Sequence, residues 1–553
     1  METDVLVVGA GPTGLMMANQ LARFGVRVMI VDRHSGPAQQ SRAMAVQART
    51  LEIYRKLGVA DQALVLGQRG TAANLWARGR PTARVPLGDI GQDISAFPFV
   101  LMLGQDENER ILGGHLRQRG VEIHWNTELT ALEHAADHEL ATLRTMDGST
   151  STVRAAYVCG CDGAHSAVRR LNGIGFPGAP YEQTFFVADT IAQGPMRPGE
   201  LNIYLWPDGF HLFFPMRGEN AWRVIGILPK ALRNRDDVTF EDVVPSILGE
   251  AGAAIRFAQC HWFSVYRIHH RSAERFRAGR CFLLGDAAHI HSPAGGQGMN
   301  TGLQDAYNLA WKLAWVLKGQ AGESLLDTYE QERMPVAQRL LRTTDRLFQL
   351  VASEGPIASF IRTRVAARLM ALAMRSGRLR RLAFRTISQV GIRYRRSALS
   401  QNLGEHPGGA PRAGDRFPWM RLRLEAGGRT EDLFGRLDDS RFSVLAVGQP
   451  VPAGAKDAAS GIDWIEVDAK EDNREKLAAA GIPVPSFYLL RPDGHVALAG
   501  RALTVEAVAN WFREHGITLD EHGKARNLRA AETLSAQRLS AFGGRRAWRA
   551  STG

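Results

Sequence analysis

Between residues 280 and 300 the chain carries a group of residue types suited to holding a ligand. Phe282 to Leu284 form a predicted short buried strand, and Gly285-Asp286 follows directly, so a carboxylate at the strand's end can accept hydrogen bonds from sugar-alcohol hydroxyls. The run Pro293 to Asn300 contains glycines that let backbone approach a ligand closely, because they have no Cβ. From Gly298 onward the apolar spacing is helical, so free N–H groups at a helix N-terminus face this loop and favour negative charge.

A second glycine motif lies at the start of the chain. An apolar strand over residues 4–8 is followed by Gly-Ala-Gly-Pro-Thr-Gly, a helix, and a further strand that ends at Asp32. Gly9 allows the tight turn, Gly11 lets backbone approach a pyrophosphate, and Gly14 lets helix and strand pack closely. Asp32 can bind ribose hydroxyls and weighs against a 2′-phosphate. The motif therefore predicts a site for the adenosine half of FAD or NAD.

A third strand, Tyr157 to Cys161, ends in Asp162-Gly163 and precedes a helix that bears arginines. Taken in chain order, the signatures at residues 9–14, 162–163 and 280–300 resemble those of the class A flavoprotein monooxygenases, the family of para-hydroxybenzoate hydroxylase and phenol hydroxylase. The resemblance implies that Asp286 holds the ribityl chain of FAD and that the loop from Pro293 to Asn300 lies along the isoalloxazine ring. It implies that Asp162 serves both the FAD pyrophosphate and the pyridine nucleotide.

The same resemblance extends the predicted FAD site to two further segments. Arg42 begins a segment that contacts FAD in the family, and Gln105 matches a glutamine that lies near the flavin. Pro12 fits the family's GxGPxG variant of the first motif. The residues predicted to bind the cofactor are Gly9, Gly11, Pro12, Thr13, Gly14, Asp32, Arg33, Arg42, Gln105, Asp162, Gly285, Asp286, Pro293, Gly295, Gly296, Gly298, Met299 and Asn300.

The activity implied by the resemblance is that of a single-component FAD-dependent monooxygenase. NAD(P)H reduces FAD, O2 gives a C4a-hydroperoxyflavin, and a phenolic or other aromatic substrate is hydroxylated. No catalytic side chain stands out, and the candidates are Tyr204, His211 and Pro293. Two alternatives stay open: Baeyer–Villiger-type oxygenation of a polycyclic substrate on the same scaffold, and a flavin-binding scaffold protein without turnover.

These motifs require an α/β fold with several domains, since 553 residues are too many for one core. We expect a Rossmann-type FAD-binding domain in two parts, residues 1–175 and 276–405, with some substrate-domain strands near 70–105 and arginine-rich helices near the end of the second part. A mainly antiparallel β-sheet for the substrate is expected over 176–275. Residues 416–518 resemble a thioredoxin-like domain that lacks cysteines, and 520–553 read as a basic, disordered tail.

Composition excludes several other classes of protein. The net charge of +12 is concentrated in residues 341–396, which hold thirteen arginines, and in the tail, so we expect no nucleic-acid binding at the predicted site. No apolar run reaches the length of a membrane span, and no metal-ligand spacing appears around the four cysteines. We expect a cytoplasmic protein without a metal, and a homodimer stays open.

Overall fold

The computed structural model describes residues 1–38, 43–86, 91–206, 209–251, 254–291, 296–352, 359–366, 372, 376–425, 428–458 and 461–519. Four predictions lie outside these residues: Arg42, Pro293, Gly295 and the tail over 520–553. Within the described ranges no helix combines the length and the apolar character that a membrane span requires.

The first sheet brings the three sequence motifs to one edge. Its strands run in the order β17-β18-β11-β1-β2-β8, with β10 and β9 attached beside β11. β1, β2, β11 and β18 are mutually parallel, so their carboxyl ends meet at the same edge, where the glycine and aspartate motifs follow. The strands are β1 (Glu2–Val8), β2 (Val28–Val31), β8 (Ile123–His124), β9 (Thr127–His134), β10 (Glu139–Thr145), β11 (Thr150–Gly160), β17 (Arg277–Ala278) and β18 (Cys281–Leu283).

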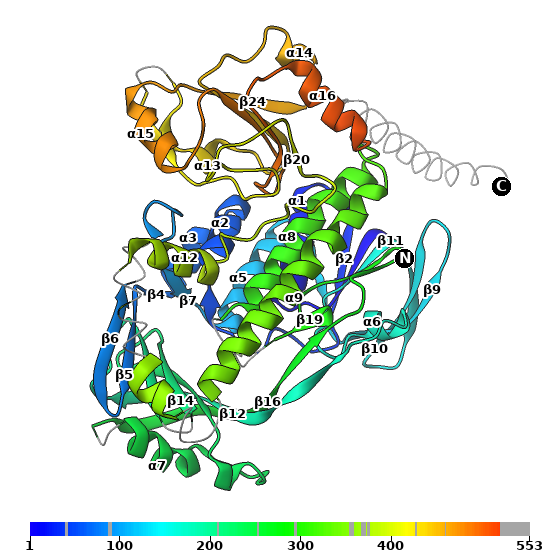
Figure 1. The fold of residues 1–553 in the computed structure, drawn as a ribbon. Helices are drawn as coiled ribbons and strands as arrows, with labels where there is room; N and C mark the ends of the chain where they lie inside the picture. Colours follow the sequence, from blue (N-terminus) through cyan, green and yellow to red (C-terminus); the bar gives the residue numbers. More distant parts are fainter. Residues whose placement is uncertain are drawn as a thin grey trace, which may run out of the picture.

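Helices cover this sheet and connect it to the rest of the molecule. α8 (Gly298–Leu317) is buried along nearly its whole length because it packs on α1 and α9 and also reaches the C-terminal domain. In Figure 1, α8 and α9 form the green column at the centre of the molecule. The other helices here are α1 (Pro12–Arg23), α2 (Ala48–Leu57), α3 (Ala60–Leu66), α5 (Gln105–Gln118), α6 (Ala167–Leu171), η2 (Gly285–Ala287) and α9 (Ser324–Ala352); a small sheet joins β3 (Ala45–Val46), β7 (Val100–Met102) and β4 (Gln68–Gly70).

The second sheet is the predicted mainly antiparallel one. Its order is β19-β16-β12-β15-β14-β13-β5-β6, and only the β13–β5 pair is parallel. Helix α7 (Phe240–Ala251) covers one face of it (Figure 1). The strands are β5 (Ala72–Ala77), β6 (Arg80–Pro86), β12 (Gly178–Gln193), β13 (Leu201–Trp206), β14 (Gly209–Pro215), β15 (Ala221–Ile227), β16 (Arg256–Ser272) and β19 (His289–Ile290), with η1 (Lys230–Leu232) between them and α7.

The arginine-rich region contains the end of α9, a π-helical turn η3 (Ile361–Ala366) and helix α12 (Gly377–Ile387). α9 packs on β14 and β16, and η3 packs on β13. α9 and η3 therefore lie against the substrate sheet. Arg378, Arg381 and Arg385 of α12 are exposed.

The C-terminal domain has its own α/β core, as predicted. Its sheet runs β20-β26-β25-β23-β24 and begins at Gln401, earlier than the predicted start at residue 416. The Val484–Pro485 peptide, directly before β25, is cis. The elements are β20 (Gln401–Asn402), β23 (Phe442–Val447), β24 (Ile462–Val467), β25 (Ser486–Leu490), β26 (Val496–Gly500), α13 (Leu433–Arg436), α14 (Ala455–Ala458), α15 (Glu471–Ala479), α16 (Val505–Glu514) and the hairpin β21 (Arg421–Arg423) with β22 (Thr430–Asp432).

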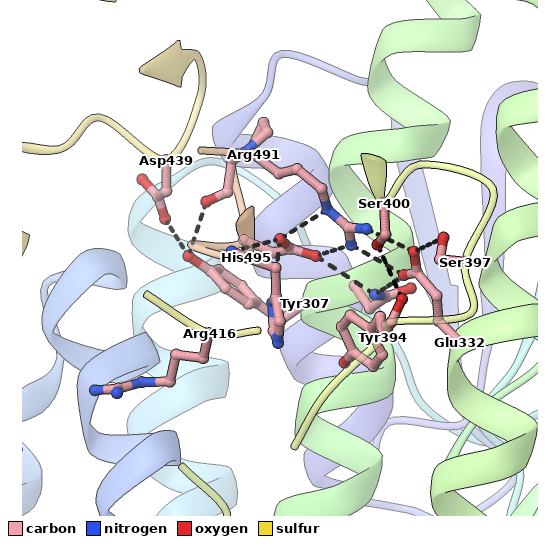
Figure 2. A network of polar contacts seen from close by, with 12 residues as sticks. Tyr307, Glu332, Tyr394, Ser397, Ser400, Arg416, Asp439, Arg491 and His495 are labelled. Atoms are coloured by element: carbon pink, nitrogen blue, oxygen red, sulfur yellow. Dashed lines mark hydrogen bonds and ion pairs between the residues drawn. The ribbon is translucent and has the colours of Figure 1, made fainter. Parts of the chain in front are cut away.

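Buried ion pairs join this domain to the FAD-binding domain. Arg491, at the end of β25, donates to both carboxylate oxygens of Glu332 on α9 at 2.5 and 2.9 Å. Lys312 of α8 reaches the same carboxylate at 2.8 Å, and Arg491 also pairs with Asp493. The side chains of Lys312, Glu332 and Arg491 are fully buried. Figure 2 shows this network, which we call the domain junction.

Candidate active site

The first glycine motif forms an open cradle at the end of β1. Gly9 has a φ of +101°, and a Cβ there would lie 2.4 Å from the Cys161 carbonyl oxygen. A Cβ on Gly14 would lie 1.8 Å from the Gly9 carbonyl oxygen, so close packing requires glycine at both positions. Gly11 meets nothing within 4 Å, and α1 begins at Pro12 with no side-chain cap. Open space beside unbonded helix N–H groups fits a pyrophosphate.

Asp32 is held at the end of β2 with its carboxylate directed toward this cradle. Its Oδ2 accepts from the Ala10 N–H at 2.7 Å, and its Oδ1 accepts from the His34 N–H at 2.8 Å. The side chain stays partly exposed, while Arg33 beside it is exposed. A carboxylate oriented in this way retains lone pairs for ribose hydroxyls.

Asp162 caps the short helix that follows β11. Its Oδ2 accepts from the N–H groups of Ala167 and Val168 at 2.6 and 3.2 Å, and burial raises the pKa of its carboxyl. Arg169, one turn further on, donates to the Ala287 carbonyl at 2.8 Å. That bond ties the third motif to the turn that carries Asp286. Sequence reasoning missed Arg169 as a site residue, although an arginine soon after Asp-Gly was the available signal.

The turn Gly285–Ala287 presents Asp286 outward. Asp286 is exposed between buried neighbours, as a ribityl-binding carboxylate must be. Gly285 has a φ of +57°, and a Cβ there would lie 2.7 Å from Thr13 Oγ1. A Cβ on Gly302 would lie 2.3 Å from the same oxygen, so Thr13 fills the space between α1, this turn and α8.

Asn300 fixes the described part of the predicted flavin loop, residues 296–300, by using its whole hydrogen-bonding capacity within the protein. Its Oδ1 accepts from the Gln47 N–H and the Thr50 hydroxyl, both at 2.8 Å. Its Nδ2 donates to the carbonyls of Ala45 and Gly296 at 2.7 and 2.9 Å. The side chain predicted to bind FAD therefore holds the loop in place, and only its backbone remains for a ligand. α8 begins beside this loop at Gly298 with no side-chain cap.

Gln105 and Met299 both make contacts on α5, which follows β7. Gln105 begins α5 and donates to Glu109 Oε1 at 2.9 Å, while Glu109 Oε2 accepts from the Ala38 N–H at 2.8 Å. Burial raises the pKa of the Glu109 carboxyl. Met299 Sδ lies 3.7 Å from Asn108 Nδ2. Glu109 thus anchors the segment that leads toward Arg42, a role that the sequence motif did not specify.

The structure places two of the catalytic candidates on the face of the substrate sheet that α7 covers. Tyr204 and His211 lie opposite each other on β13 and β14, in the aromatic core under α7. Burial lowers the pKa of His211 to about 3, so its ring is neutral near pH 7. Neither side chain has a hydrogen-bond partner among the described residues. Tyr204 and His211 are therefore core residues on the α7 side of the sheet.

The opposite face of the same sheet lies toward Ala45, next to the described end of the predicted flavin loop at Gly296. Along β14 burial alternates: His211 and Phe213 are buried, whereas Phe210, Leu212 and Phe214 are partly exposed. Phe214 packs against a cluster that includes Ala45, and a Cβ on Gly296 would lie 2.7 Å from the Ala45 Cβ. Since successive side chains of a strand point to opposite faces, the partly exposed set forms a wall on the FAD-domain side.

One group of metal-capable side chains occurs elsewhere in the described chain. His134, Glu139 and Cys281 have ligand atoms within 4.8 Å of one another. His134 Nδ1 and Glu139 Oε2 are 2.7 Å apart, which is an ordinary hydrogen bond. All four cysteines are free thiols, and burial raises the pKa of each.

The parallel sheet with its glycine cradle, the aspartate turn and the covering antiparallel sheet define an FAD-binding oxygenase fold. The family described as FAD binding domain matches residues 2–344, and the chain belongs to it. Among its relatives, 6-methylpretetramide 4-monooxygenase of Streptomyces rimosus is 34% identical over 530 residues, covering 90% of this chain and 91% of that protein. Pentachlorophenol 4-monooxygenase of Sphingobium chlorophenolicum is 33% identical over 357 residues, or 64% of this chain and 66% of that protein.

A solved structure supports the same assignment. The crystal structure of aklavinone-11 hydroxylase in complex with FAD and aklavinone is 28% identical in sequence, with a TM-score of 0.77. The match covers 93% of this chain and 99% of that one. The predicted family, fold class, FAD cofactor and monooxygenase activity are thereby confirmed: this chain is an FAD-dependent aromatic monooxygenase of class A, with NAD(P)H as its reductant.

Proposed function

We propose that this enzyme hydroxylates a polycyclic phenol bound between the flavin loop and the partly exposed face of the substrate sheet. The observation that carries the proposal is the alternation along β14, where Phe210, Leu212 and Phe214 are partly exposed although apolar. Ile203 of β13 shares that face, because it lies opposite Leu212. A broad apolar wall suits a flat ring system. The relatives named for 6-methylpretetramide and aklavinone support a substrate of this size.

The chain's own contribution is to bind, orient and shield. Bound FAD, reduced by NAD(P)H, supplies the oxygen-inserting chemistry with O2. α8 directs the positive end of its dipole toward the loop, where negative charge on a bound cofactor is favoured. The apolar wall excludes water and holds the ring flat against the loop. We further propose that O2 is the co-substrate, that the enzyme acts in the cytoplasm and that it forms a homodimer.

A pair of adjacent phenylalanines tests the assigned face. Phe214→Ala removes part of the proposed wall and should raise KM for a stimulating polycyclic phenol roughly tenfold with little loss of stability. Phe213→Ala, on the α7 face, should cost about 3–5 kcal/mol of stability and leave KM nearly unchanged in the protein that remains folded. Phenol-stimulated NAD(P)H oxidation and product analysis provide the readout.

Three results would contradict the proposal. The opposite pattern for the two variants would place the substrate elsewhere. A ring-expanded ester in place of a phenol product would favour Baeyer–Villiger oxygenation. Bound FAD that never turns over with any phenol would favour a scaffold protein.

A further inference from the structure

Asp305, a fully buried residue of α8, holds both ends of the turn that carries Asp286. Its Oδ2 accepts from the Gly285 N–H at 3.0 Å and lies 2.8 Å from His289 Nε2. Burial alone would raise the pKa of the Asp305 carboxyl, but Arg333 and His289 beside it lower that pKa. The carboxylate is therefore charged, and it acts on the turn through its two ends.

Arg333 of α9 orients this carboxylate. Its Nε donates to Asp305 Oδ1 at 2.6 Å, and its Nη2 donates to the Thr301 carbonyl at 3.1 Å. Its remaining nitrogen, Nη1, donates to the Tyr394 hydroxyl at 2.8 Å. The guanidinium is fully buried, so each of these acceptors restricts its rotation.

Tyr394 connects this arginine to the C-terminal domain. Its ring centroid lies 4.3 Å from that of His495, and the Arg491 guanidinium lies 5.5 Å from the same ring. Arg491 also binds Glu332, the neighbour of Arg333 in α9. Figure 2 shows Tyr394, Glu332, Arg491 and His495 together at the domain junction.

We propose that Tyr394, Arg333 and Asp305 are positioning residues through which the C-terminal domain sets the geometry of the flavin turn Gly285–Ala287. The domain has no thiol of its own. It acts on the cofactor through the contacts of His495 and Arg491 with the Tyr394 ring and through the buried hydrogen bonds from Tyr394 to Arg333 and Asp305. Without the Tyr394 hydroxyl, Arg333 Nη1 loses its acceptor, and the guanidinium keeps its bonds to Asp305 and Thr301 but is held less tightly. A shift of the guanidinium moves the Asp305 carboxylate, which accepts from the Gly285 N–H. The inference needs only the FAD site and does not depend on the proposed substrate.

Two tyrosines of the same interface provide the test. Tyr394→Phe removes the hydroxyl that Arg333 binds and keeps the ring beside His495. Tyr307→Phe is the matched control, because its hydroxyl donates to Asp439 at 3.1 Å across the same interface without touching Arg333 or Asp305. For each full-length variant, the FAD dissociation constant, the flavin absorption spectrum and the melting temperature of the apoprotein are measured.

Tyr394→Phe should weaken FAD binding roughly tenfold and shift the flavin absorption bands. Both variants should lower the melting temperature of the apoprotein by similar amounts. Tyr307→Phe should leave the FAD affinity and the flavin spectrum unchanged. Equal effects of the two variants on FAD affinity, or no effect of Tyr394→Phe, would overturn the proposal.

If Tyr394→Phe does not fold, Arg333→Lys takes its place, since lysine keeps the charge beside Asp305 but cannot also reach Tyr394 and Thr301. Unchanged FAD affinity in Arg333→Lys would equally refute the proposal. A wild-type chain that bound no FAD would instead contradict the family assignment.

Discussion

The FAD cradle and the domain junction are built by opposite means. The cradle is lined by glycine backbone and by the N-terminus of α1, which has no side-chain cap. The junction is lined by charged side chains that are fully buried and paired with one another, with Glu332 and Arg491 at its centre. A ligand site keeps hydrogen-bonding groups available until the ligand arrives, whereas a permanent interface must satisfy every charge within the chain. Mutations in the two regions should therefore have different consequences.

The largest effect is expected at the junction. Arg491→Met leaves Glu332 with Lys312 as a cationic partner, beside hydrogen bonds from Asn308 and Ser397, and removes the Arg491–Asp493 ion pair. The free energy of unfolding should therefore fall by about 3–5 kcal/mol. Arg436→Met is the control, because Arg436 is half-exposed and its ion pairs are long, and its loss should cost at most about 1 kcal/mol. Chemical denaturation of the two variants measures the difference. Similar losses would show that burial does not distinguish the junction from the surface.

Within the cradle, two glycines separate folding from binding. Gly14→Ala would place a Cβ 1.8 Å from the Gly9 carbonyl oxygen, so the apoprotein should lose about 1–3 kcal/mol of stability together with FAD binding. Gly11→Ala meets no protein atom within 4 Å, so the apoprotein should be as stable as wild type. FAD affinity of Gly11→Ala should nevertheless fall at least about tenfold, because the methyl group occupies the cradle. Thermal unfolding and FAD titration provide the measurements, and unchanged affinity would mean that the pyrophosphate lies elsewhere.

The smallest effect concerns the pH dependence of the junction. Burial lowers the pKa of the Lys312 ammonium to about 8, from an ordinary value of 10.5. Above pH 8 the unfolded chain therefore binds more protons at this site than the folded chain, and stability contributed by Lys312 rises with pH. Relative to Lys312→Met, wild-type stability should increase by about 1 kcal/mol between pH 8 and pH 9. A stability difference between the two proteins that stays constant over this range would show that Lys312 remains charged.

The FAD cradle was predicted from sequence because its determinants are local. Gly9, Gly11 and Gly14 lie within six consecutive residues, and Asp286 directly follows a buried strand. Parallel strands bring such motifs to one edge in any fold of this type. The general order of the domains followed from the same motifs, while the start of the C-terminal sheet at Gln401 did not, because a strand of two residues carries no recognisable pattern.

The substrate sheet shows where local pattern stops being informative. Alternation along β14 indicates that His211 and Phe214 point to opposite faces, but both faces carry aromatic residues, so the pattern does not say which one meets the flavin. Only the packing of α7 on one face and of Ala45 near the other decided it. For this reason Tyr204 and His211 were reasonable candidates from sequence and are core residues in the fold.

The sequence by itself determined the class of protein and the cofactor, and it predicted backbone positions for that cofactor, because short motifs encode close backbone approach. Tertiary structure alone decided the pairing of Arg491 with Glu332 and of Arg333 with Asp305 and Tyr394. These partners are separated by tens to hundreds of residues, and a charged residue looks the same in sequence whether it is exposed or buried. Burial, which comes from the packing of whole domains, is what makes such a charge require one particular partner.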